Sequence, residues 1–234
     1  GIEENRLMYL AVTECLKNES VKIRTENTVI LEVGGGTTEL LLMKKGKMAG
    51  AHSFRLGTTR LDLKAVSGVS SFDDIARYIE EYALNAKSLL ESELNLSEAK
   101  QFIAFGSDAI LAAINAGKPI STFLWSIELD AFDNFVNEIQ EYSVDECVAR
   151  FKISYNDAQF LRISLLVYKM FIHHTQAKTI LVPETNLREG LIISRTHADG
   201  DDLKREFYQQ IKASALSLLR KYHGDEIVNI IAHK

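Results

Sequence analysis

The chain has 234 residues, of which 46% are hydrophobic and 25% charged, enough to bury the core of one large or two small domains. Its net charge is -5 and no Lys/Arg run offsets it, which argues against nucleic-acid binding. The apolar runs are strand-sized, well short of the roughly 20 residues that span a bilayer, so we expect no membrane partner. Cys15 and Cys147 lie far apart without a CxxC pattern, as expected of two buried thiols in a reducing cytoplasm.

The first half of the chain is predicted to form a helix, three consecutive strands and a second helix. Apolar residues at helical spacing mark the helices, and short continuous apolar runs mark strands buried on both faces. A Lys-Lys-Gly-Lys segment between the second and third strands is typical of a hairpin turn. The expected bounds are residues 3–17 for the first helix, 29–33, 40–43 and 48–54 for the strands, and 71–92 for the second helix.

The second half is predicted to be mostly helical, with two further short strands. The expected strands cover residues 102–105 and 179–182, and the expected helices cover residues 107–116, 127–140, 144–151, 156–174, 187–195 and 203–223. Three antiparallel strands followed by alternating helices and strands are typical of an α/β fold. The order βββαβαβα with a helical insert resembles the ribonuclease H-like domain of the actin-like ATPase and sugar kinase superfamily, here followed by C-terminal helices.

The segment EVGGGTTEL, between the first two strands, has the composition of a phosphate-binding loop. Successive glycines let backbone N–H groups converge on one anion and let a ligand approach closely, and threonine hydroxyls add donors. A carboxylate just beyond the loop, Glu39, could orient a water or hold Mg²⁺. The alternative is a tight hairpin with no ligand. The predicted phosphate-binding residues are Gly34, Gly35, Gly36, Thr37 and Thr38.

Glu32 is unusual because it interrupts an apolar strand that ends at this loop. A carboxylate buried without a partner is costly, so a nearby metal or cation would explain it. We therefore predict Glu32 and Glu39 as Mg²⁺ ligands. The alternative places Glu32 at a sheet edge, pointing into solvent.

Four ordered segments resemble the exopolyphosphatase/guanosine pentaphosphate phosphatase (Ppx/GppA) family. They are similar to its S-G-x-E-E-A-x-L, D-[IL]-G-G-G-S-T-E-L, x-L-G-x-x-R-L and L-R-E-G-[LV] segments. Here they read GIEENRL (residues 1–7), LEVGGGTTEL (31–40), RLGTTRL (55–61) and LREGL (187–191).

This resemblance implies an activity and a set of roles. In the family, two such domains enclose a cleft in which the terminal phosphate of polyphosphate or guanosine pentaphosphate is hydrolysed with Mg²⁺. Glu4 matches the proposed general base, Glu39 the acid that positions water and metal, and residues 34–37 the phosphate cradle. The family also implies a possible homodimer. Arg188 and Glu189 are expected to pair and fix a helix start.

The same resemblance implies a domain organisation. Residues 1–199 correspond to the family's second domain, and residues 200–234 to the start of an all-helical, HD-like domain. The family's N-terminal domain, with its D-x-G-S-x-S loop, is not among these 234 residues. Because one lobe cannot enclose the phosphate, we expect the isolated chain to have no useful turnover.

Two departures from the family pattern leave other functions open. Glu32 stands where the family usually has Asp, and Phe105-Gly106-Ser107-Asp108 stands where it has a second glycine-threonine phosphate segment. An acid there would repel a polyanion. The alternatives are an ATP-binding domain of the actin-like or sugar kinase type, and a degenerate domain that binds polyphosphate or a partner without hydrolysis.

Overall fold

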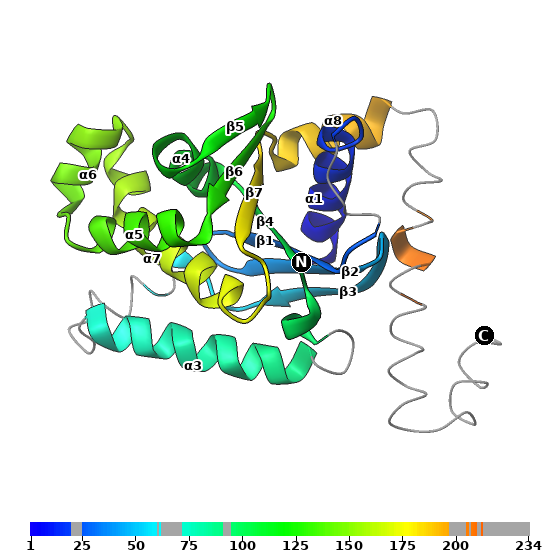
Figure 1. Cartoon of the computed structure of the whole chain (residues 1–234), viewed down its shortest axis with the longest axis horizontal. Coiled ribbons are helices and arrows are strands. Elements are labelled where there is room, and N and C mark those ends of the chain that lie inside the picture. The colour runs from blue at the N-terminus through cyan, green and yellow to red at the C-terminus, as the bar shows by residue number, and fades with distance from the viewer. Residues whose placement is uncertain are drawn as a thin grey trace.

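The computed structural model describes residues 1–19, 25–59, 61, 72–90, 95–196, 205, 207–209 and 212. These residues form a seven-stranded mixed sheet with helices on both faces (Figure 1). The strands are β1 (Thr28–Val33), β2 (Thr38–Lys44), β3 (Lys47–Phe54), β4 (Gln101–Phe105), β5 (Lys118–Ser121), β6 (Leu124–Glu128) and β7 (Thr179–Pro183). The helices are α1 (Ile2–Cys15), α3 (Phe72–Leu90), α4 (Ser107–Ala116), α5 (Leu129–Gln140), α6 (Val144–Phe151), α7 (Tyr155–Ile172) and α8 (Leu187–Thr196), with a 3₁₀ turn at Leu96–Glu98.

The strand order is β3-β2-β1-β4-β7-β6-β5. The first three strands are antiparallel neighbours, as the sequence predicts, and β1, β4 and β7 run parallel to one another. Lys45 and Gly46 both have positive φ in the β2–β3 turn, which matches the twist of a two-residue hairpin. β1 therefore lies inside the sheet, and its carboxyl end lies beside that of β4.

One prediction was wrong in the segment between α4 and α5. No strand was predicted there and a helix was expected to begin at residue 127, whereas β5 and β6 form an antiparallel hairpin and α5 begins at Leu129. Leu124 and Ile127 are buried, and β6 pairs with β7. Pro119 is tolerated because β5 is the last strand of the sheet, where a missing N–H breaks no ladder.

The two faces of the sheet bury separate cores. Alternate residues of β1 and β2 point to opposite faces, so Leu31 and Leu40 join the larger core with α3, α4, α5 and α7. Ile30 and Leu41 join a smaller core with α1, and α8 packs against α1 on this side (Figure 1).

The C-terminal predictions fall mostly outside the described residues. Residues 205, 207–209 and 212 are helical, and Phe207 is buried against Tyr9 of α1, with ring centroids 6.0 Å apart. The rest of the expected helix over residues 203–223, and residues 224–234, lie outside the described part. The domain boundary after residue 199 remains a prediction.

Both cysteines are free thiols. Cys147 is buried and Cys15 is half-buried, and burial raises the pKa of the Cys15 thiol to about 11. In the part of the chain that the structure describes, every helix is too short or too polar to cross a membrane.

Candidate active site

Residues 34–37 form a short loop that connects β1 to β2. The Gly34 N–H donates to the Thr37 carbonyl at 2.9 Å and closes the turn. Gly35 and Gly36 are exposed, and within the described residues the N–H groups of Gly35, Gly36 and Thr37 have no acceptor. Unpaired N–H groups on a loop without side chains are what an incoming anion needs.

A second glycine supports this loop from the protein side. A Cβ on Gly57 would lie 2.4 Å from the Gly35 oxygen and 2.4 Å from the Gly36 carbonyl carbon, both backbone atoms. Thr58 and Thr59 also donate their N–H groups to Gly34 and Gly35 at 3.1 and 3.0 Å. By contrast, a Cβ on Gly36 would meet nothing within 4 Å. The loop is therefore clamped on one side and open on the other.

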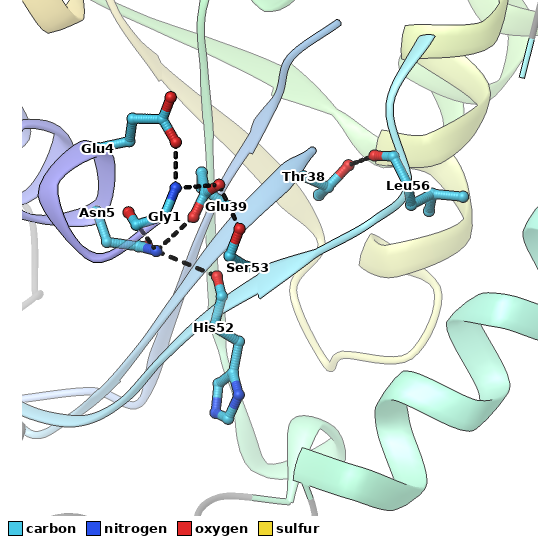
Figure 2. Close-up of polar contacts among 8 residues, drawn as sticks. All are labelled: Gly1, Glu4, Asn5, Thr38, Glu39, His52, Ser53 and Leu56. Carbon is cyan, nitrogen blue, oxygen red and sulfur yellow. Dashed lines mark hydrogen bonds and ion pairs between the residues drawn. The ribbon is translucent and has the colours of Figure 1, made fainter. Parts of the chain in front are cut away.

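The two threonines that follow the glycines differ. Thr38 is fully buried and its hydroxyl donates to the carbonyl of Leu56 (Figure 2). This geometry does not support the predicted role of the Thr38 hydroxyl as a phosphate ligand, because the bond to Leu56 uses its only proton. Thr37 is half-buried beside the exposed glycines, so its hydroxyl remains a candidate donor.

Glu39 is the most constrained acid of the site. Its side chain is only 3% exposed. Figure 2 shows three donors around it: the Gly1 nitrogen at 2.8 Å and the Ser53 hydroxyl at 2.7 Å reach Oε1, and the Asn5 side-chain amide reaches Oε2 at 2.6 Å. These donors are the residue that precedes α1, one residue of α1 and one of β3, so the carboxylate is held where the helix meets the sheet.

Glu32 lies directly across from Glu39 in the β1–β2 ladder, on the face covered by α1. Because β1 is an interior strand, the predicted alternative of an exposed sheet edge was wrong. Glu32 Oε2 is buried and has no hydrogen-bond partner among the described residues. Burial, together with the negative charges of Glu4 and Glu39, raises the pKa of Glu32 to about 7.

Glu4 lies in the first turn of α1 and completes a group of three acids. Its side chain is 51% exposed, and the Gly1 nitrogen contacts both Glu4 and Glu39 (Figure 2). Glu4 is therefore open to water, as a base requires.

This group offers oxygen ligands to a cation but is not a complete metal site. Among the described residues, no three His, Cys, Asp or Glu side chains are arranged to hold a metal ion. However, Mg²⁺ commonly uses only one or two protein carboxylates and takes its other ligands from water and phosphate. The unpartnered Glu32 oxygen beside Glu39 fits that requirement.

The loop after β4 lies next to the glycine loop. Gly106 has φ 119° and precedes α4, whose first turn has no side-chain cap. Asp108 is turned toward α7, close to Ser164, and burial raises its pKa. Asp108 is therefore sheltered against α7, and its repulsion of a polyanion stays a prediction.

A buried tyrosine joins the strands that carry these two loops. The Tyr168 hydroxyl of α7 donates to the Phe105 carbonyl at 2.6 Å and accepts the Val33 N–H at 3.2 Å. Val33 and Phe105 are the last residues of β1 and β4. Tyr168 thus fixes the spacing of the two strand ends immediately before both loops.

The LREG segment positions α1 rather than contacting the loop. A Cβ on Gly190 would lie 2.2 Å from the Leu7 carbonyl oxygen, so α8 packs directly on the backbone of α1. The expected ion pair between Arg188 and Glu189 is absent from the described contacts. Instead, Glu189 accepts hydrogen bonds from Thr185 and Asn186, at 2.5 and 3.2 Å, and Asn186 caps the helix start.

Residues 1–199 match the family model of the Ppx/GppA phosphatase family. The chain belongs to this family. No relative was found among curated protein sequences.

Solved structures show the same fold. An exopolyphosphatase from Cytophaga hutchinsonii superposes with a TM-score of 0.68 at 17% identity, covering 83% of this chain and 63% of that one. A type II variant of the Aquifex aeolicus Ppx/GppA phosphatase gives 0.63 at 17% identity with the same coverage. The predicted fold class, an actin-like ATPase-type α/β domain, is confirmed, and the chain spans about 63% of the length of these structures.

Sequence reasoning missed several residues that build the site. Asn5, Ser53 and Tyr168 were assigned no role, yet they hold Glu39 and the strand ends. A tyrosine inside a mostly apolar helix was a usable signal, because a buried hydroxyl normally finds a partner. The contact between Ser53 and Glu39 follows only from the β2–β3 register.

Proposed function

We propose that this protein hydrolyses the terminal phosphoanhydride bond of inorganic polyphosphate and releases orthophosphate. One observation carries the proposal. In a member of this family, a loop with unpaired backbone N–H groups connects the strand of Glu32 to the strand of Glu39. Glu4 lies close enough to these two acids to interact with Glu32 electrostatically. Phosphoryl transfer to water needs positioning and charge neutralisation more than covalent chemistry, and these residues supply both.

The chemistry assigns separate roles to the loop and the acids. The N–H groups of Gly35, Gly36 and Thr37 bind the terminal phosphate. Glu4, which is exposed, takes a proton from the attacking water. The water oxygen forms the new P–O bond as the bond to the bridging oxygen breaks, and the shortened polyphosphate leaves with the bridging oxygen. Glu39 orients the water through a carboxylate already fixed by three hydrogen bonds.

Mg²⁺ is the proposed cofactor, held by Glu32 and Glu39 with phosphate oxygens and water as its other ligands. When bound, it would neutralise charge on the phosphate that is transferred. Glu32 is suited to this role because a bound cation would offset the burial and the repulsion that together raise its pKa.

We also propose a second lobe and a homodimer, as in the family architecture. A second lobe, the N-terminal domain of the family, would close over the loop and exclude water, and a homodimer is the proposed assembly. Guanosine pentaphosphate is the alternative substrate, since a loop of backbone N–H groups recognises a terminal phosphate in either molecule. We also propose a cytoplasmic location.

Product analysis of the intact protein tests this function. Incubation with Mg²⁺ and long-chain polyphosphate should release orthophosphate one unit at a time, with long chains persisting until late in the reaction. The same assay with guanosine pentaphosphate measures substrate preference. Failure to release phosphate from either compound, or internal cleavage into mid-length chains, would contradict the proposal.

A further inference from the structure

Asn5 occupies an unusual position for an asparagine. It lies in the first turn of α1, where a better helix former would normally be favoured, and its side chain is only 1% exposed. Its Nδ2 group donates to Glu39 Oε2 at 2.6 Å and to the His52 carbonyl at 3.1 Å (Figure 2). Asn5 therefore links α1 to both β2 and β3 at the acid group.

The Asn5 side chain is only half satisfied. Its Oδ1 atom is buried and has no hydrogen-bond partner among the described residues. An unpaired buried acceptor opposes folding, so helix stability alone does not account for an asparagine here. The amide is held through its donor end, and that end points at Glu39.

The donors around Glu39 are divided unequally between its two oxygens. The Gly1 nitrogen and the Ser53 hydroxyl both bond Oε1. Among the described residues, Asn5 alone bonds Oε2. Bonds to one oxygen still allow the carboxylate plane to rotate about that contact. A bond to the second oxygen fixes the plane.

We propose that Asn5 is a positioning residue that sets the orientation of the Glu39 carboxylate for the attack of water. The reaction it serves rests on the proposed function, whereas its coupling to Glu39 does not. Asn5 itself contacts no substrate. The His52 carbonyl holds the amide in turn, so β3 determines where the Asn5 donor points.

Two variants of the intact protein separate hydrogen bonding from shape. Asn5→Asp keeps the shape but replaces the N–H donors with a carboxylate that repels Glu39, and Asn5→Ala loses the whole amide. Each should lower kcat for phosphate release by about tenfold or more while KM changes less than about twofold, because Asn5 acts on Glu39 and not on the substrate. Ser53→Ala, which removes a donor from the doubly bonded oxygen, should cost less.

A double-mutant cycle in the Glu39→Gln variant tests whether Asn5 acts through Glu39. If Asn5 acts through Glu39, adding Asn5→Ala to Glu39→Gln should lower kcat no further. An Asn5→Asp or Asn5→Ala variant with wild-type kcat would overturn the proposal. An equal fold-loss in the wild-type and Glu39→Gln backgrounds would do the same.

A second readout needs no substrate. The same cycle, measured as unfolding free energy by denaturant titration, should show non-additive coupling between Asn5 and Glu39. Coupling in an intact protein that releases no phosphate would support the positioning contact and reject the proposed function. Additive effects in an active enzyme would reject the Asn5 contact and leave the proposed function standing.

Discussion

The two faces of the sheet are formed by the same strands but bury different kinds of side chain. On the face covered by α3, α4, α5 and α7, buried apolar side chains form the larger core, and the Tyr168 hydroxyl makes two hydrogen bonds. On the face covered by α1, the core is smaller and ends in three acids near the glycine loop. Alternation along β1 and β2 sends Leu31 and Leu40 to one face and Glu32 and Glu39 to the other.

The buried polar groups therefore stabilise the fold on the face of Tyr168 and destabilise it on the face of Glu32. A buried hydroxyl with two partners supports folding, whereas a buried carboxylate oxygen without a partner, beside two other acids, opposes it. Removing a polar group should therefore have opposite effects on the two faces.

The largest effect is expected at Glu32. Its folded pKa of about 7 lies above the ordinary glutamate value of 4.5, so the folded state keeps a proton that the unfolded chain loses. Stability should then fall as pH rises between these values and level off above pH 7. In metal-free buffer at pH 8, Glu32→Gln should raise the unfolding free energy by up to about 3 kcal/mol, with little effect at pH 4.

Denaturant unfolding of both proteins across this pH range measures the difference. Glu98→Gln, at an exposed acid, is the control and should change the unfolding free energy by less than about 0.5 kcal/mol. Parallel stability curves for wild type and Glu32→Gln would show that Glu32 carries no such cost.

The next effect separates the two sides of the glycine loop. Gly57→Ala would place a methyl group 2.4 Å from the loop backbone and should destabilise the fold by about 2 kcal/mol. Gly36→Ala, on the open side, should change stability by less than about 0.5 kcal/mol. Denaturant unfolding compares the two variants, and equal losses would mean that the loop is not clamped by Gly57.

A smaller loss is expected on the opposite face. Tyr168→Phe removes the hydroxyl that joins Val33 and Phe105, so the partly buried Val33 N–H and the buried Phe105 carbonyl both lose this partner. The expected cost is between about 1 and 2 kcal/mol, opposite in sign to that of Glu32→Gln. Thermal unfolding of both variants at pH 8 measures the two stability changes, which should be a loss for Tyr168→Phe and a gain for Glu32→Gln. A Tyr168→Phe variant as stable as wild type would contradict the expected difference between the two faces.

The sequence predicted most of the fold because hydrophobic spacing is a local signal. The first three strands, the parallel β4 and β7, and the helices that follow them lie close to their expected bounds. The β5–β6 hairpin was missed because its strands are short and β5 contains a proline. Its strand character depends on pairing with β7, which is distant in sequence.

The candidate site was only partly predictable. Glu32 and Glu39 were recognised as unusual from their neighbours, but their direct opposition depends on the β1–β2 register. The different environments of Thr37 and Thr38 follow from the β2 pleat and the Leu56 carbonyl. Gly57 and Gly190 belong to segments that the family resemblance had marked, yet their role, close backbone packing, emerges only in three dimensions.

The measurement that tests the central claim most directly is phosphate release by Glu39→Gln. In the intact protein with Mg²⁺ and polyphosphate, losing this carboxylate should lower kcat by at least about 100-fold. Glu138→Gln, on α5, disturbs only surface contacts to Tyr142 and Arg150. It is the matched control and should retain wild-type activity. Equal phosphate release by wild type and Glu39→Gln would contradict the account and remove Glu39 from the mechanism.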